Sequence, residues 1–233
     1  MPDAIRLPEE TAFEHLGKTV VGMNSESQVL KKMNNLAGLN KVYKSYQGQG
    51  YYPSVTPAVV KRNVLENPKW YTPYTPYQAE ISQGRLEMLL NYQTMITELT
   101  GLDISNASLL DEATSAAEAV GMAYATHNFK RSKIFISESI FPQTIDVIKT
   151  RAGALGVELE FGRVEEFPWD EAKEYFGAIV QTPDNIGNMK DYSELFSRFR
   201  ENKVRSIVIQ DILSLPISKP AGEMGADIAC GSV

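Results

Sequence analysis

The sequence has 233 residues, of which 43% are hydrophobic, and a formal net charge of −6. These values are typical of a soluble globular chain with one large α/β domain or two small ones. The acidic balance argues against nucleic-acid and anionic-membrane partners, because both are bound by clustered Lys and Arg. No apolar run approaches the roughly 20 residues of a membrane span. The sole cysteine, Cys230, excludes an internal disulfide and fits a reducing compartment.

The start of the chain resembles neither kind of targeting peptide. Residues Met1–Glu10 carry three acids and one Arg, so they match neither a secretory signal nor an Arg-rich transit peptide. Residues 1–45 show an amphipathic helical pattern. A short helix is expected from Ser25 to Met33, with Ser25 as its cap.

Two loops and a short helix follow. Two glycines make Gly48–Pro53 a loop, because glycine adopts backbone angles that other residues avoid. A short helix is predicted from about Thr56 to Glu66. The Tyr/Pro-rich stretch Tyr71–Tyr77 forms the second loop. Its prolines leave the backbone little freedom to lose on ordering, so it can hold side chains in a cleft at low cost.

From residue 79 onward the pattern is that of an α/β domain. A long helix is predicted near Ala79–Thr100, and Gly101 suits its end. Strands then alternate with helices, which implies right-handed crossovers and a mostly parallel sheet. We therefore expect an N-terminal segment of helices and loops at 1–78 and an α/β domain at 79–233. The predicted strands are Lys133–Ser137, Val157–Phe161, Gly177–Gln181, Val204–Ile209 and Ala226–Cys230, with helices at Asp111–Tyr124, Gln143–Leu155 and Asp191–Glu201.

The N-terminus of the helix that begins at Asp111 is a candidate phosphate site. Free N–H groups at helix N-termini, beyond the carboxyl ends of the strands, can hold a phosphate group. Here Asp111 is a good side-chain cap and Glu112 adds a second negative charge. Two carboxylates stabilise a helix start but repel phosphate. The sequence predicts a capped helix there and no phosphate site.

The sequence gives little support for a catalytic histidine, a metal site or a Ser-His-Asp triad. The two histidines, His15 and His127, lie in unrelated helical contexts and are predicted to be surface or helix-end residues. No Cys/His spacing indicates a metal site, and no Ser-His-Asp set can be assembled.

Several long, ordered segments carry a resemblance to a known family. The Tyr/Pro loop and helix start Tyr71–Arg85, and the segment Gly101–Glu118, closely resemble the N-terminal half of glycine cleavage system P-proteins. The match runs from about Lys44 to the C-terminal end. It also includes Gln47–Tyr52, Arg62–Asn67, Asn91–Met95 and Gly222–Ser232.

The resemblance implies a fold and an activity. The fold would be the large domain of fold-type-I pyridoxal phosphate transferases, of aminotransferase type, left incomplete at its C-terminal end. The activity would be that of glycine dehydrogenase (decarboxylating). Such enzymes decarboxylate glycine with pyridoxal phosphate and pass the aminomethyl group to the lipoyl arm of H-protein. The location would be cytoplasmic in a bacterium and the mitochondrial matrix in a eukaryote.

P-proteins consist of two related halves, fused or made as separate subunits, with the active cleft between them. The lysine that carries the cofactor belongs to the second half. The resemblance therefore implies three partners for this chain: a second half or subunit, lipoylated H-protein, and glycine. This chain would line the cleft with Tyr51, Tyr52, Tyr74, Tyr77, Gln78, Ser82, Gln83 and Arg85.

These side chains suit a cleft because tyrosine rings stack, tyrosine hydroxyls donate hydrogen bonds, and Arg85 could pair with a carboxylate. A packed aromatic patch beneath the loop is the alternative for the tyrosines. Asp211 ends a predicted strand. In active enzymes of this fold, an Asp at such a strand end protonates the pyridine nitrogen of the cofactor. An exposed strand end or a helix cap is the other interpretation.

One lysine and one aromatic residue set this chain apart from an active enzyme. Lys219 is the only lysine after Asp211, and it precedes the strand Ala226–Cys230 instead of following it, so it is a poor Schiff-base candidate. The Schiff-base lysine is therefore predicted to be absent from this chain. Phe141 stands where the family usually has His before Pro-Gln, and it offers an aromatic face without a proton donor.

Three hypotheses remain. The chain could be an N-terminal fragment of glycine dehydrogenase that is inactive alone, which the missing lysine favours. It could be a non-catalytic partner subunit that completes the site of a separate half. It could also be a free-standing enzyme of aminotransferase type, which Asp111, Glu112 and the missing lysine oppose.

Overall fold

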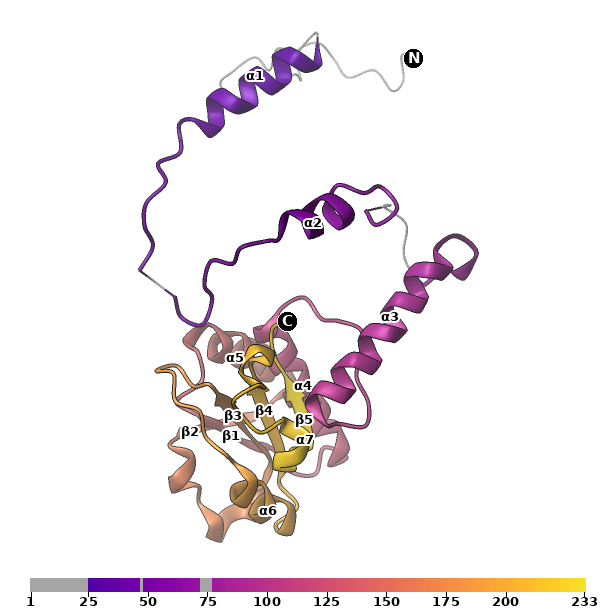
Figure 1. The fold of residues 1–233 in the computed structure, drawn as a ribbon. Coiled ribbons are helices and arrows are strands. Elements are labelled where there is room, and N and C mark those ends of the chain that lie inside the picture. Colours follow the sequence, from indigo (N-terminus) through magenta and orange to yellow (C-terminus); the bar gives the residue numbers. More distant parts are fainter. Residues whose placement is uncertain (1–24, 47, 72–76) are drawn as a thin grey trace, which may run out of the picture. The chain divides into compact units, whose positions relative to one another are not determined.

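The structure, a computed structural model, describes residues 25–46, 48–71 and 77–233 (Figure 1). The chain divides into two compact units, Met1–Gly48 and Gln49–Val233. The domain boundary expected between residues 78 and 79 stays a prediction. Expectations for residues 1–24, and for Tyr74 in the Tyr/Pro loop, fall outside the described residues.

Helix α1 (Glu26–Ala37) is the regular element described in the first unit. The Oγ of Ser25 accepts a hydrogen bond from the N–H of Gln28 at 3.4 Å, which confirms the predicted cap. The helix runs past Met33, but residues 38–45 form a turn and irregular chain, so the helical expectation for them was wrong. The Asn40 side chain explains the end, because it donates to the carbonyl of Ala37 at 3.2 Å.

The second unit begins with the glycine turn and two helices. Residues 48–53 contain neither helix nor strand, which confirms the predicted loop. Helix α2 (Ala58–Val60) continues as the π-helical segment Lys61–Leu65, close to the predicted bounds. Helix α3 (Ala79–Thr100) has the predicted bounds, and Gly101 ends it with φ +69°, in the left-handed region that favours glycine.

The sheet is parallel throughout the described strands. Its order is β2-β1-β3-β4-β5, and every described pairing is parallel, which confirms the predicted α/β class. The strands follow the predicted segments within a few residues, and β3 extends further than expected. They are β1 (Lys133–Ser137), β2 (Glu158–Gly162), β3 (Tyr175–Thr182), β4 (Arg205–Gln210) and β5 (Ile228–Cys230).

Helices cover both faces of the sheet (Figure 1). Helices α4 (Glu112–Thr126) and α5 (Pro142–Leu155) pack on one face with Ile134, Ile136, Ile207 and Ile209. Helices α6 (Ser193–Glu201) and α7 (Ala221–Met224) pack on the other with Phe135, Val180 and Val208. Alternate strand residues point to opposite faces, so each strand contributes to both cores.

Sequence analysis missed the short elements. These are α7 and the 3-10 segments Val164–Glu166, Trp169–Glu174 and Ile212–Ser214. Each is too short for a hydrophobic period to be readable, and tertiary packing decides whether it forms.

Helix α7 packs against the end of α3 through a contact between two glycines. A Cβ atom on Gly222 would lie 1.9 Å from the carbonyl oxygen of Gly101, so only glycine allows this approach. The contact holds the end of α3 against α7, and the residues on either side of Gly101, Thr100 and Leu102, line a cavity. Among the described helices, none has the length and apolar character that crossing a membrane requires.

Candidate functional site

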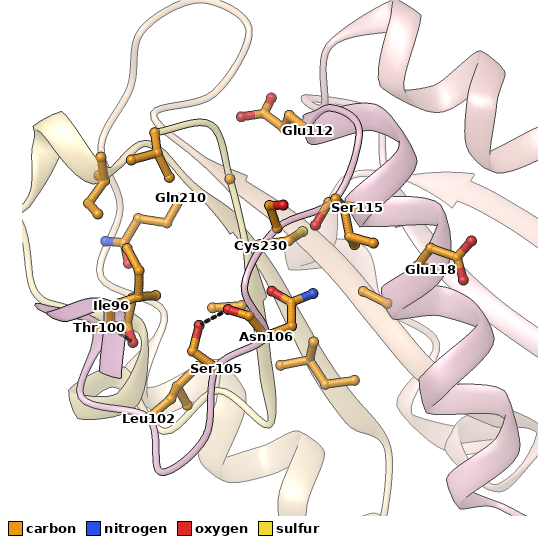
Figure 2. Close-up of a pocket in the computed structure, with 18 of the residues that line it drawn as sticks. Ile96, Thr100, Leu102, Ser105, Asn106, Glu112, Ser115, Glu118, Gln210 and Cys230 are labelled. Carbon is orange, nitrogen blue, oxygen red and sulfur yellow. Dashed lines mark hydrogen bonds between the residues drawn. The ribbon is translucent and has the colours of Figure 1, made fainter. Parts of the chain in front are cut away.

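The cavity lies beside β5 and has a volume of 1040 Å³. Figure 2 shows Glu112, Ser115 and Glu118 projecting from α4 on one side, with Ile96 and Thr100 of α3 across from them. Gln210 at the end of β4 and Cys230 of β5 contribute the wall between. Residues 102–111, the loop that joins α3 to α4, complete it. The cavity runs along the whole of the edge strand β5, from Asp227 before the strand to Gly231 after it. It therefore includes the carboxyl end of the strand, where ligands bind in open α/β sheets.

The start of α4 is capped by its own carboxylate. The N–H of Thr114 donates to Oδ1 of Asp111 at 2.7 Å, which confirms the predicted cap. This hydrogen bond is the main reason that the pKa of Asp111 is lowered, and the N–H of Ala113 contributes to it. The N–H groups that could face a bound phosphate are therefore already occupied by Asp111.

Glu112, the next residue, is a buried carboxylate. Its side chain is only 7% exposed, and its Oε2 accepts a hydrogen bond from the N–H of Ser232 at 3.1 Å. Burial raises the pKa of Glu112, and the negative charges of Asp211 and Asp111 raise it further, against the opposing effect of the Ser232 N–H. Its Oε1 is buried and has no hydrogen-bond partner in the described part of the chain.

Asp211 follows β4 as an exposed cap. Its Oδ1 accepts a hydrogen bond from the N–H of Leu213 at 2.9 Å and so begins the 3-10 segment Ile212–Ser214. Its charge still acts on Glu112, so the two carboxylates lie at the same end of the sheet. The contacts of Asp211 are those of a helix cap, one of the interpretations that the sequence left open.

Lys219 is engaged away from the cavity. Its Nζ lies 2.8 Å from Oδ2 of Asp191 and 3.0 Å from Oγ of Ser193. The hydrogen bond from Lys219 is the main cause that lowers the pKa of Asp191 to about 2. Neither Lys219 nor any other described lysine is among the residues that line the cavity.

Pyridoxal phosphate needs a phosphate site, a partner for the pyridine nitrogen and a lysine. At the start of α4, Asp111 occupies the N–H of Thr114, and Glu112 adds a buried carboxyl whose Oε1 has no partner among the described residues. Asp211 acts as a cap, and Lys219 forms an ion pair elsewhere. The described residues therefore do not fit the cofactor.

The glycine turn packs against the start of α5. The Phe141 ring leaves no room for a side chain at position 50, since a Cβ there would lie 2.3 Å from the ring, and Gly50 has φ +91°. Nε2 of Gln143 donates to the carbonyl of Gln49 at 2.9 Å and holds the same turn. Phe141 is itself fixed by its N–H, which donates to Oε1 of Gln181 at 3.0 Å.

Tyr51 is a predicted site residue that lies within the electrostatic influence of Glu112 and Asp111. Its ring centroid is 6.4 Å from that of Phe141. Burial raises the pKa of the Tyr51 hydroxyl, and the charges of Glu112 and Asp111 add to the effect. The hydroxyl therefore stays protonated at neutral pH and can donate a hydrogen bond. Its neighbour Tyr52 is 77% exposed.

The remaining predicted site residues lie around the start of α3. Tyr77 is 73% exposed, Gln78 precedes the helix as its cap residue, and Gln83 is exposed. Ser82 is buried at a kink in the helix, and its hydroxyl has no hydrogen-bond partner within the described ranges. None of them, nor Arg85, lines the cavity, which uses the other end of α3. A 22-residue helix is about 33 Å long, so these residues form a group separate from Glu112. Their role stays a prediction.

Several cavity residues were missed by sequence analysis. Asn106, Ser115, Gln210 and Cys230 are small or polar, and sequence analysis gave none of them a role. The position of Gln210 and Cys230 in strands, and of Ser115 in the first turn of α4, were the available signals. Burial, with Glu112 adding, raises the pKa of Cys230 to about 12, so its thiol is a poor nucleophile. Outside the cavity, His127 is the residue at the end of α4, as predicted.

The fold defines a class of protein. The arrangement is that of fold-type-I pyridoxal-phosphate-dependent enzymes. The sphingosine-1-phosphate lyase Bpss2021 of Burkholderia pseudomallei shares it with a TM-score of 0.56 at 12% identity, over 82% of this chain and 48% of that one. At this identity the likeness shows the fold alone.

The family follows from the sequence as a whole. The sequence model of the glycine cleavage system P-protein matches residues 1–233, and the chain belongs to that family. It is 50% identical over 208 residues to a Vibrio vulnificus (strain CMCP6) protein named glycine dehydrogenase (decarboxylating), covering 89% of this chain and 22% of that protein. A Dictyostelium discoideum protein of the same name, designated mitochondrial, is 49% identical over 236 residues, covering 100% of this chain and 23% of that protein.

A solved structure agrees with this assignment. The crystal structure of glycine decarboxylase (P-protein) of the glycine cleavage system, in inhibitor-bound form, matches with a TM-score of 0.79 and 32% identity. The match covers 97% of this chain and 53% of that one. This chain spans less than a quarter of the length of the two curated relatives.

Proposed function

We propose that this chain acts as the N-terminal part of a glycine dehydrogenase (decarboxylating) and forms one wall of its active cleft. The observation that carries the proposal is the family match over residues 1–233, combined with an α4 start that is occupied by carboxylates. The reaction would decarboxylate glycine with pyridoxal phosphate and pass the aminomethyl group to lipoylated H-protein. Pyridoxal phosphate would be held by another part of the enzyme. The activity would be cytoplasmic in bacteria and in the matrix of mitochondria in eukaryotes.

The residues of this chain would position and shield the reactants. The Tyr51 hydroxyl keeps its proton beside Glu112 and Asp111, so it can donate a hydrogen bond to a carboxylate or carbonyl. The Phe141 ring supplies an apolar surface under the glycine turn and excludes water there. Tyr52, Tyr74, Tyr77, Gln78, Ser82, Gln83 and Arg85 would line the remainder of the cleft.

A chimeric enzyme tests the activity. The 208-residue matching segment of the Vibrio vulnificus relative would be replaced by the corresponding residues of this chain. Release of carbon dioxide from carboxyl-labelled glycine would then be measured with lipoylated H-protein present. We expect the chimera to retain decarboxylation that depends on H-protein. A folded chimera that binds pyridoxal phosphate but releases no carbon dioxide would contradict the proposal.

A spectrum of the 233-residue chain tests where the cofactor is held. Mixed with pyridoxal phosphate, the chain alone should give no visible absorbance band of an imine to a lysine, because Lys219 is paired with Asp191. A saturable band that disappears in Lys219→Ala would show that this chain holds the cofactor. Activity of the chain mixed with a separately made second half, without fusion, would favour the partner-subunit hypothesis.

A further inference from the structure

The centre of the glycine turn, Gln49–Tyr51, has a backbone shape that is not favoured locally. Gln49 has φ +49° and Gly50 has φ +91°, so two consecutive residues lie in the left-handed region. Glycine adopts that region freely, but a residue with a Cβ atom, such as Gln49, is strained there. Strained backbone of this kind persists only where the surrounding structure holds it. The shape of the turn therefore depends on contacts from outside it.

The start of α5 supplies two such contacts. The Phe141 ring fills the space beside Gly50, where a Cβ atom would lie 2.3 Å from the nearest ring carbon. Nε2 of Gln143 donates to the carbonyl of Gln49 at 2.9 Å. The ring limits how closely the turn approaches α5. The hydrogen bond fixes its orientation, because such a bond weakens steeply away from its preferred angle.

The start of α5 is itself anchored to the middle of the sheet. Gln181 lies on β3, the central strand of the five, and is 2% exposed. Its Oε1 accepts a hydrogen bond from the N–H of Phe141 at 3.0 Å, and its Nε2 donates to the carbonyl of Pro183 at 3.1 Å. Two amide side chains thus connect β3 to the glycine turn. None of these contacts involves β5 or the residues after it.

Stability alone does not explain a glutamine at position 143. The Oε1 of Gln143 is buried and has no hydrogen-bond partner among the described residues. A buried acceptor without a partner destabilises a fold, so an apolar side chain of similar length would cost little there. What an apolar side chain cannot do is donate to Gln49. The useful part of Gln143 is therefore its N–H donor.

Tyr51 depends on the shape of the turn. It follows Gly50 directly, and its ring centroid lies 6.4 Å from that of Phe141, with 43° between the ring planes. The side chain is still 47% exposed, so packing leaves it able to contact a ligand. The direction of a side chain follows its backbone angles. Moving a group that positions a reactant by about 1 Å can lower a rate about a hundredfold.

We propose that Gln143 is a positioning residue: through Gln49 it holds the glycine turn in the shape that directs Tyr51 into the active cleft. This role deepens the proposed function and rests on it, because Tyr51 is one of the residues that would line that cleft. Gln143 itself touches no reactant. Its effect on catalysis passes through Tyr51, whereas a residue that only stabilises the fold would act independently of the Tyr51 hydroxyl.

A double-substitution cycle in the chimeric enzyme measures this dependence. Tyr51→Phe removes the hydroxyl, and Gln143→Met removes the donor at nearly the same side-chain length. Each change alone should lower kcat/KM about tenfold. The enzyme with both changes should also lose about tenfold, instead of the roughly hundredfold that independent effects give. Losses that multiply would overturn the proposal.

Gln93→Met is the matched control. Nε2 of Gln93 also donates to a backbone carbonyl, that of Ser105, but this bond joins α3 to the loop that follows it. The loss of kcat/KM in Gln93→Met, whatever its size, should multiply with that of Tyr51→Phe. If Gln143→Met does not fold, Gln143→Glu takes its place, since a carboxylate has nearly the same shape and cannot donate.

A fluorine label separates this proposal from the proposed function. Meta-fluorotyrosine replaces Tyr51 in the 233-residue chain, and its fluorine NMR resonance is recorded without cofactor or partner. The ring current of Phe141 should displace the resonance from that of the free amino acid. Gln143→Met should move it toward the free value, and Gln93→Met should leave it in place.

The two measurements fail in different ways. A resonance that Gln143→Met leaves unmoved overturns the positioning role, even if the chimera is active. A resonance that moves, in a chain whose folded chimera releases no carbon dioxide, supports the hold of Gln143 on Tyr51 and contradicts the proposed function alone. A moved resonance together with non-multiplying losses supports both.

Discussion

Replacing Glu112 by Gln probes the stability of the fold. The side chain is 7% exposed, accepts one hydrogen bond from Ser232 and leaves Oε1 without a partner among the described residues. Gln has nearly the same shape, keeps an acceptor for Ser232, and removes a charge that lies near Asp111 and Asp211. A neutral amide costs less to bury than a carboxylate. We expect the free energy of unfolding to rise by about 1 kcal/mol near neutral pH.

The pH dependence gives the sign of the effect. The pKa of Glu112 is raised in the folded state above its ordinary 4.5, so the folded chain binds the proton more tightly than the unfolded chain. This contribution to stability is complete below 4.5 and is lost as the pH rises through the folded-state pKa. The amide of the Glu112→Gln variant does not titrate in this range. The stability difference between the two chains should therefore be small in acid and grow toward neutral pH.

Urea denaturation of both chains across this pH range, followed by circular dichroism, measures the difference. Glu118→Gln is the matched control, because Glu118 lies on the same helix and forms an exposed ion pair with Arg151. Losing that pair should lower stability by at most about 1 kcal/mol. A Glu112→Gln chain that is less stable than the wild type at neutral pH, or a stability difference that does not change with pH, would refute the electrostatic reasoning.

Three further substitutions test packing and the cleft. Phe167 is 3% exposed and packs against four aromatic rings, so Phe167→Ala should lower the free energy of unfolding by about 3–5 kcal/mol. The control Phe161→Ala removes an exposed ring and should lower it by less than about 1 kcal/mol. Equal losses for the two variants in urea titrations would contradict this prediction. Gly222→Ala places a Cβ 1.9 Å from the carbonyl oxygen of Gly101, so the free energy of unfolding should fall by about 1–3 kcal/mol and the thermal midpoint should fall with it. An unchanged midpoint would argue against this contact. In the chimeric enzyme, Tyr77→Phe should lower kcat/KM about tenfold without changing the thermal midpoint. The control Tyr43→Phe should leave both quantities unchanged. If the two variants have equal kcat/KM, Tyr77 does not line the cleft.

The helices and strands were readable because their signals are local. Gly101 at the end of α3 and Asp111 at the start of α4 act through neighbours within one helical turn, so their residue types predict the boundaries. The strands carry buried apolar runs between such boundaries, as in β4, and those runs are typical of a parallel sheet. Asn40 shows the limit, because the amphipathic pattern did not reveal that its side chain caps α1.

The candidate site was only partly readable. The role of Asp111 as a helix cap was predicted and is confirmed. The absence of a phosphate site at α4 and of a Schiff-base lysine stays a prediction. The cavity itself was not foreseen, because its walls come from α3, α4, β5 and the end of β4. Tyr51 and Tyr77 were grouped by sequence, but the structure puts Tyr51 near Glu112 and Tyr77 at the far end of α3 from the cavity.

The sequence by itself determined the family and the parallel α/β class, since motifs, periodicity and residue order are properties of the chain. Only the tertiary structure decided that Glu112 is buried with one oxygen unpaired, because its hydrogen-bond donor Ser232 lies 120 residues away in sequence. Desolvation depends on which distant segments pack together, and that information is not contained in any local pattern.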